Sequence, residues 1–172
     1  MSLIIETGAG LANAESYAAV ATADAYHLAR LNASWALLDT PTKEASLRKA
    51  TEYMVGQYRE RWKGVRAGLV QALDWPRYNV QLDDVGISAI AAYVQSNVVP
   101  VEVQNACCVL ALKASTGELA SDLQRTVKEK TIGPITTVYA DGAPEAVRYR
   151  SVDMMLKPYL AGSTVSGVLV RS

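Results

Sequence analysis

Apolar residues recur every three or four positions over several stretches of the chain, which is the period of an α-helix. The longest stretch predicts a helix over residues 40–62, with an inward stripe formed by Leu47, Thr51, Met54, Tyr58 and Trp62. Thr40–Pro41 supplies its start, a capping residue followed by a proline at the first helical position. A shorter helix is predicted over residues 19–31, with its stripe at Val20, Ala23, His27 and Leu31.

The second half of the chain holds two more stretches with helical period. Residues 100–117 predict a central helix with a buried face at Val103, Cys107, Leu110 and Ala114. A last helix begins near Ser151 and is kinked or ended by Pro158, with one side formed by Val152, Met155, Leu156 and Tyr159. The stretch between Gly64 and Val99 is rich in turn residues and predicts a long connection with one short helix over residues 87–95.

Two segments near the C-terminus lack the helical period. Residues 127–131 and 135–139 are rich in β-branched residues and flank Gly133–Pro134, which predicts a β-hairpin over about 126–140. Residues 162–172 have too many small residues for a helix and too many apolar ones for a free tail. We therefore expect a mainly α fold: a small helical bundle with its hairpin as one domain, residues 1–161, and an extended C-terminal tail, residues 162–172.

Composition and charge narrow the class of protein. Of the 172 residues, 50% are hydrophobic, which excludes disorder over most of the chain. Seventeen basic residues offset seventeen acidic ones, so no strong overall charge points to a nucleic acid or a membrane surface. The apolar runs are shorter than the about 18 residues of a membrane span, and the N-terminus lacks the pattern of a secretory signal. Cys107 and Cys108 are adjacent, which disfavours a disulfide and fits a reducing cytoplasm.

The residue types that carry catalysis are scarce. The chain has a single histidine, His27, and the stripe places it on the inward face of its helix. The adjacent cysteines lack the spacing of a zinc site. Gly8-Ala9-Gly10 lacks the third glycine and the preceding strand of a phosphate-binding loop, and it predicts a turn. We therefore expect no catalytic activity, no cofactor and no metal.

The distribution of charge is more informative than its total. The net charge is −3, +4, −4 and +3 over residues 1–42, 43–77, 78–122 and 123–172. Alternating charge of this kind favours head-to-tail assembly of identical subunits. The basic second segment also offers an alternative, a platform for single-stranded nucleic acid. Its candidate DNA-facing residues are Arg59, Arg61, Lys63 and Arg66, and its aromatic residues are Tyr58, Trp62, Trp75 and Tyr78. Because Tyr58 and Trp62 lie on the apolar stripe, we favour core aromatics flanked by solvated cations.

Several short motifs occur together in one order along the chain. They are Glu6-Thr7-Gly8, Ala23-Asp24-Ala25-Tyr26, Trp62-Lys63-Gly64, Trp75-Pro76-Arg77 and Val99-Pro100 before an alanine-rich helix. With these motifs the chain resembles a family of tailed-bacteriophage proteins labelled DnaT-like single-stranded-DNA-binding proteins, which look like head–tail connector proteins. Ala19 departs from the family, whose members usually carry a Ser or Thr helix cap there.

The resemblance implies two different functions. A connector forms a ring, usually of twelve subunits, in the virion neck, where it joins the portal protein to a tail or stopper protein and extends the channel for duplex DNA. The DnaT-like label implies single-strand binding during phage replication instead. We expect the connector role, with assembly in the host bacterial cytoplasm, only weak contacts to duplex DNA and no membrane. The motif residues that we expect to be architectural are Trp62, Gly64, Trp75, Pro76, Arg77 and Pro100, and the residues that we expect to dock on a neighbouring subunit or the portal are Val165, Val168, Leu169, Val170 and Arg171.

Overall fold

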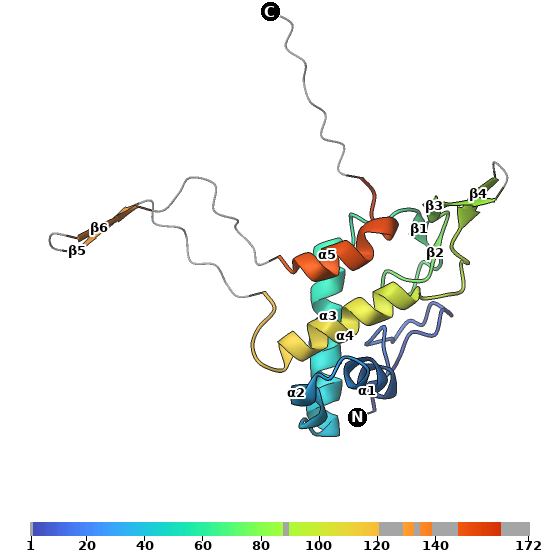
Figure 1. The fold of residues 1–172 in the computed structure, drawn as a ribbon. Coiled ribbons are helices and arrows are strands. Elements are labelled where there is room, and N and C mark those ends of the chain that lie inside the picture. The colour runs from blue at the N-terminus through green and yellow to red at the C-terminus, as the bar shows by residue number, and fades with distance from the viewer. Residues whose placement is uncertain (1, 88–89, 121–128, 133–134, 139–147, 163–172) are drawn as a thin grey trace, which may run out of the picture.

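The computed structural model describes residues 2–87, 90–120, 129–132, 135–138 and 148–162. Its helices are α1 (Val20–Leu28), α2 (Ala33–Ala36), α3 (Thr40–Tyr58), α4 (Val101–Ala114) and α5 (Arg150–Leu156), and a 3₁₀ turn, η1 (Lys157–Tyr159), follows the last of them. The strands pair as antiparallel hairpins: β1 (Val65–Arg66) with β2 (Arg77–Tyr78), β3 (Gln81–Ile87) with β4 (Ile90–Tyr93), and β5 (Glu129–Ile132) with β6 (Ile135–Val138). The fold is mainly α with small β elements, as predicted (Figure 1).

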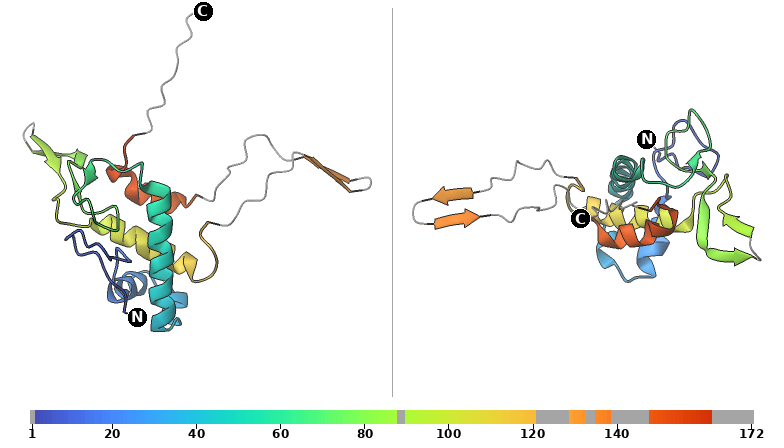
Figure 2. Two further views of the ribbon diagram at one scale, coloured as in Figure 1. Left: turned by 180° about the vertical axis from the view of Figure 1, so that it is seen from behind. Right: turned by 90° about the horizontal axis from the view of Figure 1, so that it is seen from above.

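The core forms where α4 crosses α3 and packs against α1 and α5 (Figures 1 and 2). The predicted stripe of α4 is confirmed, because Val103, Cys107 and Leu110 are fully buried. The stripe of α3 is also buried, at Leu47, Thr51, Met54 and Tyr58. Two fully buried residues of α5, Val152 and Leu156, close the other side of α4.

The longest helix has different ends from those that the sequence predicts. Asp39, not Thr40, is its N-cap, and the Asp39 carboxylate accepts the N–H of Thr42 at 2.9 Å. Aspartate is the stronger capping residue, so Pro41 becomes the second helical position. The helix ends at Tyr58, and Trp62 belongs to the segment that follows it.

The end of α1 corrects a second prediction. This helix stops at Leu28 instead of 31, and Leu31 adopts a left-handed φ of +56°. The N–H of Leu31 donates to the carbonyl of Leu28 at 3.1 Å, and the N–H of Asn32 donates to that of His27 at 3.0 Å. These are the two bonds of a Schellman motif. Because the chain turns away there, Leu31 is 88% exposed rather than part of the inward stripe.

The short helix predicted over residues 87–95 is wrong. Of the described residues in this stretch, Ile87 ends β3 and residues 90–93 form β4, with Gln81 opposite Tyr93 and Ile87 opposite Ile90. Their register shifts between Leu82 and Gly86. Isoleucine and tyrosine favour strands over helices.

The hairpin predicted near the C-terminus is confirmed. Residues Glu129 and Val138 are opposite each other at one end of β5–β6, and Ile132 and Ile135 at the other. Both figures show this hairpin apart from the helical body (Figures 1 and 2). The tail residues Val165, Val168, Leu169, Val170 and Arg171 lie outside the described residues.

The N-terminal segment folds around the buried carboxylate of Glu6, which is 3% exposed. The Glu6 oxygens accept the backbone N–H groups of Gly8, Gly10 and Leu11 at 2.8, 2.9 and 2.8 Å. Gly8 has a φ of +100°, and a Cβ there would lie 1.9 Å from the carbonyl oxygen of Asn97. The motif Glu6-Thr7-Gly8 is therefore a carboxylate with the backbone that binds it.

Replacing this carboxylate should destabilise the whole fold. In Glu6→Gln an amide NH₂ takes the place of an acceptor that faces backbone N–H groups, and hydrogen bonds to charged groups contribute about 1.5–3 kcal/mol. We expect the free energy of unfolding to fall by about that amount in a denaturant titration. Glu60→Gln, at an exposed residue, is the control and should change little. Equal stability of the two variants would contradict this role for Glu6.

Candidate functional site

The Trp-Pro-Arg motif lies inside the protein, next to a cluster of aromatic rings. Trp75 is fully buried, and its ring meets those of Trp62 and Tyr159 edge to face at centroid distances of 5.6 and 5.7 Å. Tyr58 extends the cluster, 5.7 Å from Trp62. The Trp75–Pro76 peptide bond is cis. The cluster joins the end of α3, the loop before β2 and the turn after α5.

Arg77 binds the backbone that follows α3. Its guanidinium donates to the carbonyl oxygens of Lys63, Gly64 and Asp74 at 2.8, 2.8 and 3.1 Å. Arg77 is only 6% exposed, and burial lowers its pKa from the ordinary value. Gly64 has a φ of +66°, and a Cβ there would lie 2.0 Å from the carbonyl oxygen of Tyr78. The close approach that Arg77 fixes therefore requires glycine at residue 64.

Asp74 is the acceptor at the centre of this region, and its side chain is completely buried. The Asp74 carboxylate accepts from Arg59 Nε at 2.9 Å and from Trp62 Nε1 at 3.3 Å. Its backbone N–H donates to the hydroxyl of Tyr17 at 2.9 Å. The sequence analysis did not assign a role to Asp74 or Tyr17, although Asp74 directly precedes the Trp75-Pro76-Arg77 motif.

The four cations proposed to face DNA all have partners within the chain. Arg59 pairs with Asp74, Lys63 pairs with Asp83, and Arg61 lies 3.7 Å from Asp153. The fourth, Arg66, donates to the carbonyl oxygen of Gln71 at 3.3 Å. With Trp62 and Trp75 buried, this segment does not present the open aromatic faces and unpaired cations of the single-strand alternative, and both aromatics belong to the core, as favoured from the sequence. Tyr78, 48% exposed, is the aromatic residue of that set that reaches the surface.

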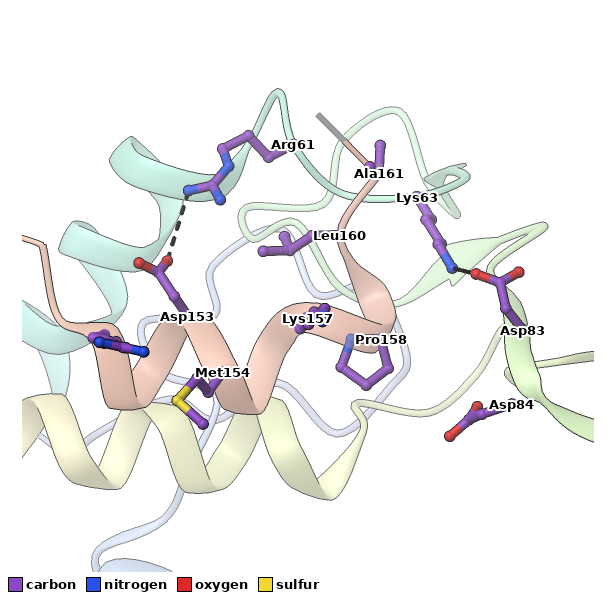
Figure 3. A pocket seen from close by; sticks show the side chains of 12 residues that line it. Arg61, Lys63, Asp83, Asp84, Asp153, Met154, Lys157, Pro158, Leu160 and Ala161 are labelled. Carbon is purple, nitrogen blue, oxygen red and sulfur yellow. Dashed lines mark hydrogen bonds and ion pairs between the residues drawn. The ribbon is translucent and has the colours of Figure 1, made fainter. Parts of the chain in front are cut away.

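A depression of about 770 Å³, lined by several charged residues, opens beside two of these ion pairs (Figure 3). It lies between α5, β3 and the segment after α3. In Figure 3, Arg61 points to Asp153 on one side and Lys63 to Asp83 on the other. The lining adds two further cations, Arg150 and Lys157, one further carboxylate, Asp84, and the exposed side chain of Met154. The depression therefore combines four cations with three carboxylates and an apolar edge.

Arg150 and Lys157 differ from the other cations of the depression. Within the described part of the chain, neither makes a salt bridge. Arg150 is the first residue of α5, and Lys157 directly follows the last residue of this helix and opens η1. Sequence reasoning missed them because they are far from the basic segment, although the +3 charge of residues 123–172 included them.

The histidine and the cysteines are enclosed in the core. His27 is 1% exposed, and its Nε2 lies 3.1 Å from the carbonyl oxygen of Cys108 while its Nδ1 lies 3.0 Å from the Asn32 amide nitrogen. These partners fit a neutral ring that donates from Nε2, and burial lowers the His27 pKa. Cys107 contacts the hydroxyls of Ser16 and Thr51. Residues 2–87, 90–120, 129–132, 135–138 and 148–162 hold no group of three or more His, Cys, Asp or Glu side chains that could bind a metal.

Among the described helices, none is both long enough and apolar enough to cross a bilayer.

The fold and these contacts define a small, mainly α protein whose Trp-Pro-Arg motif binds its own backbone. A family model described as "Putative DnaT-like ssDNA binding protein" matches residues 1–172, and the chain belongs to this family. The family label that the sequence motifs implied is thereby confirmed, whereas the connector role stays a prediction. Neither the curated proteins nor the solved structures gave a match to the chain.

The two thiols should be inert in the folded protein. Burial raises the pKa of Cys107, and it raises that of Cys108 to about 12. Both side chains are also fully buried. A reagent therefore meets neither a reactive thiolate nor an accessible sulfur atom in the folded protein. We expect a thiol reagent at mildly alkaline pH to label neither residue in the native chain and both in concentrated guanidinium chloride. Rapid labelling of the native protein would show that the core around α4 opens.

Replacing the buried tryptophan should lower stability rather than remove a binding surface. Large-to-small changes at a buried Trp lower the free energy of unfolding by about 3–5 kcal/mol, so Trp75→Ala should lower the melting temperature markedly. Tyr93→Ala, at a ring 56% exposed, is the matched control and should have little effect. A Trp75→Ala protein that kept its melting temperature but lost binding to single-stranded DNA would contradict the architectural role of the motif.

Proposed function

We propose that the protein is a structural subunit of the bacteriophage neck, without catalytic activity. In this role it forms an oligomeric ring, of twelve subunits by the family resemblance, that joins the portal to a tail or stopper protein and extends the DNA channel. The ring assembles in the host bacterial cytoplasm and contacts duplex DNA only weakly.

The observation that carries this proposal is the position of the β5–β6 hairpin. A two-stranded hairpin by itself is at best marginally stable in water. Figures 1 and 2 show this one apart from the helical body, and among the described elements its strands pair only with each other. A neighbouring subunit would supply packing for such a hairpin. The alternating charge along the chain supports the same kind of assembly.

Single-strand binding is the second candidate, and the family description favours it. Binding without sequence preference uses aromatic faces and a basic groove. Trp62 and Trp75 are buried, so stacking on them is blocked. The observation that favours this candidate is the depression of Figure 3, where Arg150 and Lys157 join Arg61 and Lys63. Single-strand binding at this depression would therefore depend on phosphate contacts.

Mass photometry and negative-stain electron microscopy of the purified chain, alone and with portal protein, test the first proposal. We expect ring-shaped particles, with portal present or without it. A chain that stays monomeric in both conditions would contradict the connector role.

Fluorescence polarisation with labelled single-stranded and duplex DNA, over a range of salt concentrations, separates the two candidates. For a connector we expect weak binding to both DNA forms and a shallow dependence on salt, because few phosphates are neutralised by each subunit. For the second candidate, binding should prefer single strands, and Arg150→Ala with Lys157→Ala should weaken it. Lys49→Ala is the control, since Lys49 is exposed but does not line the depression.

A further inference from the structure

A second depression lies where α1 ends and α2 begins, and it is more apolar than the first. Its volume is about 510 Å³. The buried rings of His27 and Trp35, with centroids 4.7 Å apart, lie at its base. Leu28 and Leu31 form its edge and are 76% and 88% exposed. We call this surface the α1–α2 groove.

The backbone conformation of Leu31 indicates that its exposed side chain takes part in binding. Leu31 occupies the left-handed position of the Schellman motif that ends α1, with a φ of +56°. Glycine or asparagine is usual there, because a side chain with a Cβ is strained in this conformation. The folded subunit thus holds a leucine in an unfavourable backbone conformation and gains almost no burial from it. Strained residues that display an apolar side chain are characteristic of binding surfaces.

We propose that the α1–α2 groove binds residues 165–170 of a second copy of this chain, an inference that rests on the proposed ring. Ten residues follow Gly162 beyond the described part, and their apolar members are Val165, Val168, Leu169 and Val170. An extended segment of this kind can place alternate side chains into an apolar groove of an already ordered partner.

Charge complementarity supports the same occupant. The one charged side chain in residues 163–172 is Arg171. Asp24 lines the groove with its side chain 46% exposed, and its Oδ1 accepts from Trp35 Nε1 at 2.7 Å and from Lys43 Nζ at 2.9 Å. No hydrogen bond to its Oδ2 is found among the described residues, which leaves this oxygen as an acceptor for a guanidinium next to Val170.

The arrangement of the helical body favours a second copy over the chain's own tail. Figure 1 shows α1 and α2 at the opposite end of the body from α5, which precedes Gly162. Before Gly162 the chain is fixed there, because the N–H of Ala161 donates to the carbonyl of Arg61 at 2.7 Å. A groove at one end and a tail that starts at the other form a head-to-tail contact, the kind that repeats around a closed ring.

Disulfide cross-linking between two variants of the full chain tests this contact. Leu31→Cys and Val168→Cys proteins are mixed and oxidised; the native thiols are buried and do not compete. We expect a cross-linked heterodimer, at least tenfold more abundant than with Leu69→Cys in place of Leu31→Cys. Leu69 is a matched control because it is 92% exposed and lies outside the groove. An equal yield from both pairs, or no cross-link from the first, would overturn the proposal. So would a doubly substituted chain that closes mainly on itself.

A second variant separates binding from folding. Leu31→Asn keeps a residue that tolerates the left-handed conformation, so we expect an unchanged or higher melting temperature together with at least tenfold weaker self-association by mass photometry. Leu69→Asn should leave both unchanged. A fall in melting temperature with normal association would show that Leu31 serves the fold, and would overturn the proposal.

The outcomes also distinguish this inference from the proposed function. Rings that form normally from Leu31→Asn protein would refute the groove contact and leave the connector role standing. If the unsubstituted chain forms no ring, alone or with portal, the connector role itself fails and the groove contact with it.

Discussion

The buried carboxylate of Asp74 is the interaction on which the arrangement of the chain depends. Through its side chain and its backbone it holds Arg59 at the end of α3, Trp62 in the next segment and Tyr17 from the N-terminal region. A charge with no exposed surface is stable only when such partners surround it. Arg77 completes the region by binding three carbonyl groups. Residues from four parts of the sequence are thereby fixed around the loop that contains Asp74. The basic and aromatic residues in this region stabilise the fold.

The long helices could be predicted because burial and period agree in them. The stripes of α3 and α4 are almost entirely buried, as their spacing indicated. The ends were harder to predict, since Asp39 and Thr40 are both capping residues and only the geometry decides between them. The segment over residues 87–95 failed for a different reason. Its alanine and valine residues fit either period, and pairing with β3, a contact that no local pattern records, makes residues 90–93 a strand.

The chemistry of the site was only partly visible in the sequence. The burial of Tyr58 and Trp62 follows from their place on the apolar stripe, and both are buried. That Arg61 and Lys63 would be paired could not be predicted, because their partners Asp153 and Asp83 come from distant positions. Leu31 was placed inside by its spacing from His27, yet the left-handed turn carries it to the surface. A helical pattern cannot show where a helix stops, and exposed leucines therefore arise at the ends of predicted elements.

The Glu6 segment has a consequence for how glycine-rich motifs are interpreted. Successive backbone N–H groups that converge on one point form an anion nest, the device with which many proteins hold phosphate. Here the anion is the Glu6 side chain of the same segment, bound at 2.8–2.9 Å by the N–H groups of residues 8, 10 and 11. An incoming phosphate would have to displace a covalently tethered competitor whose local concentration never falls. The anion site is therefore always occupied by Glu6. Gly8 and Gly10, which look like part of a nucleotide-binding loop, instead bind a carboxylate of their own chain.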